Sequence, residues 1–361
     1  MSHSTRTATY SEVSAALAVQ SDQQLTRLLD SAKQLGPGMG GSTFEIDVEG
    51  VKVFGKQLRL TELEQRPEHR MSTANIFGLP TFFQRNVGSV GFGVWRELAA
   101  NAMTTGWVLS KKLESFPMMY HWRVLEGRSA AGAAASGNLA DIDHMTKYWE
   151  CSSIVGKRLT ALADATASVV IFLEHIPCTL SAWLERQMGA GSHAIESACQ
   201  LVEDGLTVDV PLMNHLGLLH GDAHFGNILT DGDRLYFADL GLATSKRFML
   251  DPEELTYSQE NASLDRSYVR ANWVNWLIKE FAPPMSDPAS RMAMVRSIAR
   301  GQSIHQLIPG LPPSVAAVIE RHANVAAVIN DFYAKLQGDS RNASYPRDEI
   351  EPLLLTVASK Q

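Results

Sequence analysis

The segment of residues 220–241 carries the acids Asp222 and Asp239 and the amide Asn227 within a span short enough to form one hairpin. It reads HGDAHFGNIL and, after a short polar interval, YFADLG. The apolar runs on both sides of Asp231-Gly232 predict two antiparallel strands joined by a tight turn. The second strand would carry Asp239 back beside the loop that holds Asp222 and Asn227.

An acid, an amide and a second acid are the groups that phosphoryl transfer from a nucleotide requires. Such a reaction needs a group that orients the attacking hydroxyl and accepts its proton, and oxygen ligands for the metal ions that neutralise the phosphates. Asp222 can supply the first function, and Asn227 with Asp239 can supply the second. His220 and His224 are four residues apart, but they lie on a predicted loop and not on a helix, so a zinc pair is not favoured.

These residues resemble the protein-kinase-like superfamily, whose catalytic loop reads HxDxxxxN and whose metal-binding acid begins a DFG-type triplet. Gly221 stands where protein kinases carry arginine, and the HGDxHxGN sequence is more similar to the aminoglycoside and choline phosphotransferase branch. The resemblance implies an α+β fold of two lobes, a small antiparallel-sheet lobe and a large, mainly helical lobe, with ATP and Mg²⁺ bound between them. It also implies that Asp222 is the catalytic base or hydroxyl orienter and that Asn227 and Asp239 are magnesium ligands.

A glycine cluster precedes two predicted strands in the N-terminal part of the chain. Gly36, Gly38 and Gly41 fit the spacing GxGxxG. This spacing alone is weak evidence, because dinucleotide-binding folds use it to enter a helix. Here an alternating strand pattern, a turn at Glu49-Gly50 and a second strand follow, so the glycines can lay their backbone amides over nucleotide phosphates. A turn without a ligand is the alternative.

Lys56 resembles the lysine of the third kinase strand, which pairs with the α- and β-phosphates. Lys52 competes with it, since residues four apart on a strand point to the same face. Lys52 lies almost on the turn and Lys56 lies deeper in the strand, which favours Lys56. Phe54 departs from the family pattern, because it would occupy the roof of the adenine pocket, where a smaller residue is usual. A solvated surface lysine is the alternative.

A carboxylate on the following helix normally fixes such a lysine. The apolar spacing of residues 94–109 predicts a helix, and Glu97 on this helix is the chosen partner. The distance along the chain implies that residues 65–93 are an insertion. Glu62 and Glu64 are nearer in sequence but lie in a polar stretch. The alternative for Glu97 is a helix side chain that is exposed to solvent and has no partner lysine.

A β-branched and aromatic run at residues 169–173 predicts a buried strand. The segment after it resembles the hinge between two kinase lobes, where backbone groups of Glu174 and Ile176 would hydrogen-bond the adenine edge. We therefore expect residues 1–173 to form the nucleotide-binding lobe, with a leading helical segment at 11–35 and insertions near 65–93 and 126–140. Residues 174–361 would form the catalytic and substrate lobe, with helices at 179–187, 194–215, 267–281 and 315–336.

Charge and composition limit the partners of the chain. The 361 residues carry a formal charge of −7, without the basic surplus of a nucleic-acid binder. The first residues lack the apolar stretch of a signal peptide, and no window approaches a membrane span, which predicts a cytoplasmic protein. An acidic stretch from Asp251 to Asp265 follows the metal triplet. The simpler interpretation of this stretch is a solvent-exposed charged loop. The more specific one is a binding site for a cationic acceptor.

The sequence does not identify the molecule that accepts the phosphate. No AlaProGlu triplet follows Gly241, which favours a small-molecule hydroxyl over a protein substrate. A serine/threonine protein kinase of atypical bacterial type is the second interpretation. A nucleotide-binding pseudokinase scaffold is the third, and the intact set of acid, amide and acid argues against it.

Overall fold

The computed structural model describes residues 1–37, 41–127, 139–283 and 287–358. The chain divides into two compact units, one made of residues 1–177 and 238–255 and the other of residues 178–237 and 256–361. We expected one boundary between residues 173 and 174; the units instead separate after Pro177, and the stretch 238–255 returns to the first unit. Asp239 therefore belongs to the same unit as Lys56 and Glu97.

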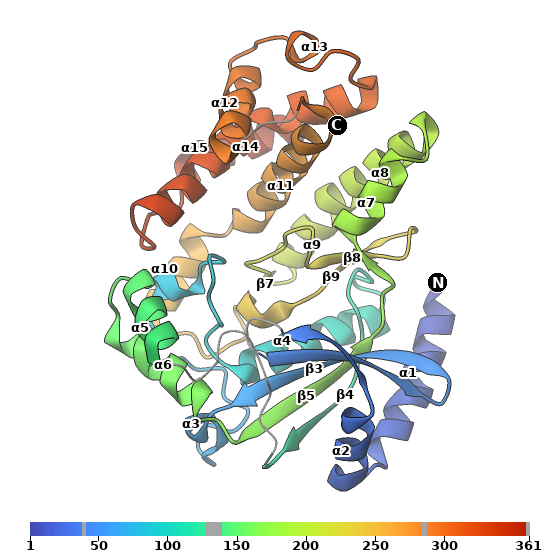
Figure 1. Ribbon diagram of the computed structural model, residues 1–361, viewed down its shortest axis with the longest axis vertical. Coiled ribbons are helices and arrows are strands. Elements are labelled where there is room, and N and C mark those ends of the chain that lie inside the picture. The colour runs from blue at the N-terminus through green and yellow to red at the C-terminus, as the bar shows by residue number, and fades with distance from the viewer. Residues whose placement is uncertain (38–40, 128–138, 284–286, 359–361) are drawn as a thin grey trace. The chain divides into compact units, whose positions relative to one another are not determined.

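A five-stranded sheet forms the centre of the first unit, in the order β1-β2-β3-β5-β4 (Figure 1). All of its neighbouring strands are antiparallel. The strands are β1 (Lys33–Pro37), β2 (Gly41–Val48), β3 (Val51–Leu60), β4 (Met119–Leu125) and β5 (Ala167–Glu174). Every residue of β5 is buried, as its β-branched and aromatic sequence predicts for a strand between two neighbours.

The turn between β2 and β3 sets the register of the strand that carries Lys56. Glu49 and Gly50 have φ values of 53° and 82°, the left-handed backbone that a two-residue hairpin turn requires. Asp47 Oδ1 accepts a hydrogen bond of 2.8 Å from the Gly50 amide. The resulting register places Lys56 opposite Thr43 on β2.

Helix α4 (Val94–Leu109) packs against this sheet and has the bounds that its apolar spacing predicts. Val94, Trp95 and Leu98 on one face of α4 share a buried apolar cluster with residues of β3 and β5. The remaining helices of this unit are α1 (His3–Ala18), α2 (Asp22–Asp30), α3 (Glu62–Gln65), α5 (Leu139–Tyr148) and α6 (Ser153–Ala163).

The leading segment at 11–35 is not one helix. Helix α1 ends at Ala18, and α2 begins anew because the Ser21 hydroxyl and the Gln24 side chain form a capping box. Residues from Lys33 onward leave the helical pattern and form β1, which pairs with β2. Backbone pairing with β2 outweighs the weak helical spacing of residues 33–35.

The segment 65–93, expected to be loop-like, folds against α5 and α6 around a second apolar cluster. Beyond Gln65, the last residue of α3, and a 3-10 turn at Thr81–Gln84, it has no regular helix or strand. Phe83 and Phe92 from this segment are buried with Trp149, Val155 and Leu159. The insertion is therefore a packed part of the first unit, and most of the expected insertion at 126–140 lies outside the described residues.

The second unit is mainly helical. Its three-stranded sheet has the order β6-β8-β9 and contains β6 (Cys178–Thr179), β8 (Ile228–Thr230) and β9 (Leu235–Phe237). The antiparallel pairing of β8 with β9 confirms the expected hairpin. The helices are α7 (Leu180–Met188), α8 (Ser192–Asp204), α9 (Val210–His215), α11 (Leu264–Phe281), α12 (Pro288–Ala299), α13 (Ile304–Leu307), α14 (Pro313–Gly338) and α15 (Arg347–Ala358).

A π turn over Gly205–Asp209 joins α8 to α9, within the single helix expected at 194–215. Helix α10 (Pro252–Glu260) begins in the first unit and ends in the second. The two-residue strands β7 (Leu218–Leu219) and β10 (Thr244–Ser245) and a 3-10 turn at Leu240–Leu242 complete the described elements. The chain is thus a mixed α+β protein with a small antiparallel sheet and a helical part. Within the described ranges, no helix has both the length and the apolar character needed to cross a lipid bilayer.

Candidate functional site

Lys56, Glu97 and Asp239 form one ion-paired cluster in the first unit. Lys56 Nζ lies 2.6 Å from Glu97 Oε1 and 2.7 Å from Asp239 Oδ1. The Lys56 and Glu97 side chains are 12% and 8% exposed, whereas that of Asp239 is 49% exposed. Strand β3, helix α4 and the chain after β9 each supply one member, so three motifs far apart in sequence meet here. Asp239 is the most exposed of the three side chains.

The two carboxylates of this cluster favour the charged form of Lys56, whereas the charge of Asp239 disfavours ionisation of Glu97. Burial disfavours the Lys56 ammonium, but the carboxylates of Asp239 and Glu97 outweigh burial and hold the pKa of Lys56 above its usual range. Burial raises the pKa of Glu97, and Lys56 opposes that rise. Lys56 is therefore a fixed cation, held by a buried carboxylate on one side and a half-exposed carboxylate on the other.

The backbone at Asp239 is in an uncommon conformation. Its φ of 60° and ψ of 72° are left-handed, a region that aspartate tolerates better than most residues. Two residues later, a Cβ at Gly241 would lie 3.2 Å from Glu97 Oε2 and 3.4 Å from Asp239 Oδ1. The absence of a side chain at Gly241 thus lets this segment approach α4 closely enough for both carboxylates to reach Lys56.

The competing residues lie elsewhere. The Lys52 side chain is 64% exposed and pairs with Glu45 at 3.4 Å. Glu62 is exposed, and Glu64 is buried against Arg158, whose guanidinium donates to both of its carboxylate oxygens. Neither glutamate is a partner of Lys56, and Glu97 is.

The glycine cluster is described only in part, because Gly38 lies outside the described residues. Gly36 is in β1 with a φ of 141°, opposite Thr43. Gly41 begins β2, and a Cβ there would come within 1.9 Å of the Gln57 carbonyl oxygen on β3. Gly41 therefore has a packing role between two strands, in addition to any role toward a nucleotide.

The expected hinge begins with a residue that is already tied into the fold. The Glu174 amide donates to the Met118 carbonyl at 2.8 Å, and its carboxylate accepts from the Met118 amide at 3.1 Å. Arg6 also donates to the Glu174 carboxylate. The Glu174 N–H is thus engaged, and Ile176 is half-buried two residues further along.

The other two predicted residues, Asp222 and Asn227, contact each other in the second unit. Asn227 Nδ2 donates to the Asp222 backbone oxygen at 3.0 Å and to Asp222 Oδ2 at 3.1 Å. Asn227 Oδ1, the atom that could ligate a cation, is left free of these bonds. His224 Nε2 lies 4.0 Å from Asp222 Oδ2, too far for a hydrogen bond.

Asp265 on α11 holds the backbone of the same loop, and the sequence did not indicate this role. Its Oδ2 accepts from the His220 amide at 2.7 Å, and its Oδ1 accepts from the Gly221 amide at 2.9 Å. Asp265 is 1% exposed, so it is neither part of a solvated acidic loop nor open to a cationic acceptor. Its spacing of four from Val269, a core position of α11, is the signal that could have revealed its burial.

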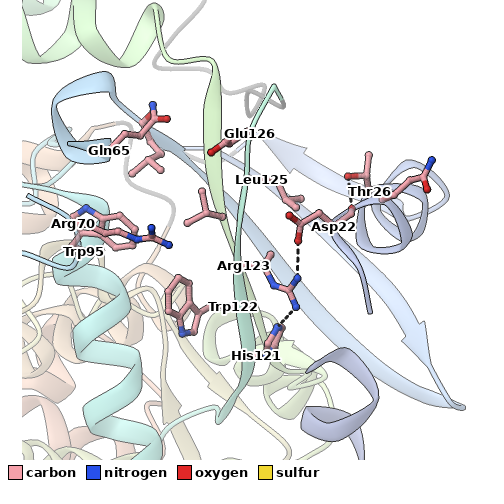
Figure 2. Close-up of a pocket in the computed structure, with 13 residues that line it drawn as sticks. Asp22, Thr26, Gln65, Arg70, Trp95, His121, Trp122, Arg123, Leu125 and Glu126 are labelled. Atoms are coloured by element: carbon pink, nitrogen blue, oxygen red, sulfur yellow. Dashed lines mark hydrogen bonds and ion pairs between the residues drawn. The ribbon is translucent and has the colours of Figure 1, made fainter. Parts of the chain in front are cut away.

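A separate cavity of about 720 Å³ lies in the first unit and contains none of the predicted site residues (Figure 2). Trp95 of α4, Trp122 and Arg123 of β4 and Asp22 of α2 are among its lining residues. Figure 2 shows Arg123 between Asp22 and His121; its distance to Asp22 Oδ1 is 2.6 Å. Arg123 thus already has an anionic partner within the chain.

In the described part of the chain, no group of three or more histidine, cysteine, aspartate and glutamate side chains is arranged to hold a metal ion. The predicted magnesium ligands are a different set, one amide and one carboxylate. Neither a protein-family model nor a curated protein sequence matches this chain.

Proposed function

We propose that this protein is a kinase of the protein-kinase-like fold, which transfers the γ-phosphate of ATP to a hydroxyl of a small molecule with the help of Mg²⁺. The observation that carries the proposal is the meeting of Lys56 with Glu97 and Asp239, which are 41 and 183 residues away in sequence. These residues belong to three separate sequence motifs that resemble those of phosphotransferases. Their meeting is what the resemblance to phosphotransferases predicts, and it supports the proposal.

The residues fit a nucleotide and its metal ion in their chemistry. Lys56 is a fixed cation that can bind phosphate oxygens, and Glu97 holds it in place from the buried side. Asp239 exposes about half of its side chain, and Asn227 keeps its Oδ1 free of the bonds to Asp222. A carboxylate and an amide oxygen are ligands that Mg²⁺ accepts, together with waters and phosphate oxygens. When bound, Mg²⁺ would supply charge neutralisation of the phosphates.

Asp222 would act on the acceptor hydroxyl. The hydroxyl oxygen forms the new bond to the γ-phosphorus, the bond to the β,γ-bridging oxygen breaks, and ADP leaves. The hydroxyl proton passes to the Asp222 carboxylate. The Asn227 side chain donates to that carboxylate and orients it, and Asp265 holds the backbone of the loop around it.

The structure of the acidic stretch from Asp251 to Asp265 supports a cationic acceptor less than its sequence alone does. Asp265 and Glu254 are buried and occupied by partners inside the chain. Asp251, Glu253 and Glu260 are the exposed acids of this stretch that could still face an acceptor. We therefore propose a small-molecule acceptor without assigning its charge.

Thermal unfolding with and without Mg-ATP tests the nucleotide site first. A ligand bound only by the native state raises the melting temperature by mass action. We expect Mg-ATP to raise it in the wild type and Asp239→Ala to lose the Mg²⁺-dependent part of the rise. Glu253→Ala, which removes an exposed acid from the same segment, is the control. Equal shifts in Asp239→Ala and wild type would contradict the assignment of Asp239.

The release of ADP in the presence of a metabolite library then identifies the acceptor. Incubation with γ-labelled ATP alone is the companion experiment. Label on the chain itself would favour the protein kinase interpretation, and nucleotide binding without any phosphate transfer would favour the nucleotide-binding pseudokinase scaffold. ADP release that depends on one class of alcohol is the result that the proposal predicts.

A further inference from the structure

Arg96, the residue before Glu97, is buried in the first unit and ties α4 to the chain that follows Asp239. Arg96 Nη1 lies 2.6 Å from Glu254 Oε1, and both side chains are at most 5% exposed. Arg96 Nε donates to the Thr73 carbonyl at 2.7 Å. The guanidinium also lies over the Phe92 ring, with its central carbon 4.9 Å from the ring centroid. Consecutive residues on a helix point about 100° apart, so Arg96 and Glu97 bind different parts of the unit.

Glu254 is itself fixed at the start of α10. Its Oε2 accepts from the Asp251 amide at 3.2 Å, and its own amide donates to Asp251 Oδ1 at 2.9 Å. The Met249 amide donates to Thr73 Oγ1 at 2.9 Å, which joins the same stretch to the 65–93 segment. The segment that starts with Asp239 is thus attached at its far end to the helix that carries Glu97.

Two further contacts hold α4 and the residues after Asp239. Glu64 Oε1 accepts a hydrogen bond of 3.0 Å from the Val94 amide, so a buried carboxylate provides a partner for one backbone amide in the first turn of α4. Gln84 Nε2 donates to the Leu242 carbonyl at 2.6 Å. Both contacts come from residues 61–93, so this part of the chain touches both elements that deliver carboxylates to Lys56.

We infer that Arg96 and Glu254 form a positioning pair, which keeps α4 and the segment 239–254 in the one arrangement where Glu97 and Asp239 both reach Lys56. The inference rests on the proposed function in one respect only: the cluster it positions is the one we assign to nucleotide phosphates. Arg96 itself touches no reacting group. A shift of α4 that withdrew Glu97 would have to pull the buried Arg96 guanidinium away from Glu254 and Thr73. The geometry of the cluster therefore depends on a contact on another face of the helix.

The chemical shielding of Lys56 tests this pair without any nucleotide. An amine that is mostly buried and held in two ion pairs reacts slowly with a water-soluble acylating reagent, whereas the exposed Lys52 on the same strand reacts freely. The ratio of Lys56 to Lys52 acylation, measured by peptide mass spectrometry in brief labelling, reports on the cluster in the folded protein. Lys52 serves as the reference within each sample.

Three variants and one control decide the result. Arg96→Met removes the cation, and Arg96→Met/Glu254→Met removes both charges so that no buried charge is left unpaired. Arg96→Lys keeps the charge but loses the planar fork that reaches two acceptors. Arg123→Met, which breaks the exposed pair with Asp22 in the same unit, is the control. Each is labelled below its melting transition, with folding checked by circular dichroism.

We expect the acylation ratio to rise about threefold or more in Arg96→Met and in the double variant, to rise by less in Arg96→Lys, and to stay at the wild-type value in Arg123→Met. A wild-type ratio in a folded double variant would show that the pair only stabilises the unit and would overturn the inference. If neither methionine variant folds, Arg96→Lys decides, and a wild-type ratio there overturns the inference equally.

The two proposals fail in different ways. If the wild type binds no Mg-ATP while the acylation ratio rises in the variants, the proposed function fails and the positioning pair stands. If the wild type transfers phosphate and folded variants keep both the acylation ratio and the transfer rate, the pair fails and the function stands. A positioning role predicts a lower transfer rate in the folded double variant, whereas a merely structural role predicts a lower melting temperature alone.

Discussion

Arg6 binds the carboxylate of Glu174 in a two-point contact, with Nε 2.8 Å from Oε1 and Nη2 2.7 Å from Oε2. The same guanidinium donates to the carbonyls of Glu114 and Phe116 at 2.9 and 2.6 Å. Both side chains are buried, and 168 residues separate them. Helix α1 is thereby fastened to the end of β5, where the expected hinge begins.

Replacing Arg6 should destabilise the first unit strongly. Arg6→Met leaves a buried carboxylate without its cation and removes the guanidinium hydrogen bonds to two carbonyls, which costs about 3–5 kcal/mol in comparable buried pairs. The free energy of unfolding in urea measures the effect. The control is Arg347→Met, which breaks an exposed pair within α15 and should change stability by about 0.5 kcal/mol or less. Equal effects of the two changes would contradict the importance of the Arg6 contact.

Lys56 and Lys52 can be separated by the same substitution. Lys56→Met removes the cation from the cluster and should lower phosphate transfer by about a hundredfold or more, as loss of a preorganised electrostatic contact does. Lys52→Met removes the same charge from an exposed side chain on the same strand and should leave the rate almost unchanged. Steady-state ADP release with an identified acceptor is the measurement. If Lys52→Met lowered the rate and Lys56→Met did not, the phosphate-binding lysine would be Lys52, near the start of β3.

Asp222→Asn should separate affinity from rate. The amide keeps the shape of the carboxylate but cannot accept the hydroxyl proton, so transfer should fall by about a hundredfold or more while nucleotide affinity changes only a few-fold. Nucleotide titration beside ADP release measures both. Asp233→Asn, an exposed acid in the turn of the β8–β9 hairpin, is the matched control. Full activity of Asp222→Asn would remove this loop from the catalytic assignment.

The acid dependence of stability should report on Glu64. Burial opposes ionisation of this carboxyl, but Arg158 and the bonds from Thr61 outweigh burial and lower its pKa below the ordinary value of 4.5. A lowered pKa in the folded state contributes stability that is present above pH 4.5 and is lost as the pH falls through the folded-state pKa.

Glu64→Gln should therefore be much less stable than the wild type at pH 7, and the difference should shrink in acid. Urea unfolding at a series of pH values from neutral downward measures it, with the exposed Glu62→Gln as control. A difference between Glu64→Gln and the wild type that stays constant down to pH 3 would contradict the ion pair as its source.

Local sequence patterns were sufficient to predict the helix and strands that carry the candidate site residues. Helix α4 followed from apolar spacing, the β8–β9 hairpin followed from a turn signal, and the choice of Lys56 over Lys52 followed from its depth in a strand. Each of these features lies within about twenty residues of sequence, where periodicity and turn chemistry act. The pairing of Lys56 with Glu97 needed one further premise, the family resemblance.

Long-range ion pairs were not predictable in the same way. Arg6 and Glu174 are 168 residues apart, and Arg96 and Glu254 are 158 residues apart. A buried arginine has the same sequence appearance as a solvated one, because burial is decided by what packs over it. The acidic stretch shows the error that follows: Glu254 and Asp265 read as solvated charges, yet each is buried and holds a separate part of the chain.

The return of residues 238–255 to the first unit has a consequence for how that unit comes into being. A fragment that stopped at Pro177 would leave Lys56 with one carboxylate instead of two, and Arg96 with no anion at all. During synthesis, the ribosome must release the entire stretch 178–237 before Asp239 and Glu254 can emerge. The first unit therefore cannot complete its folding until all of residues 178–237 have been made.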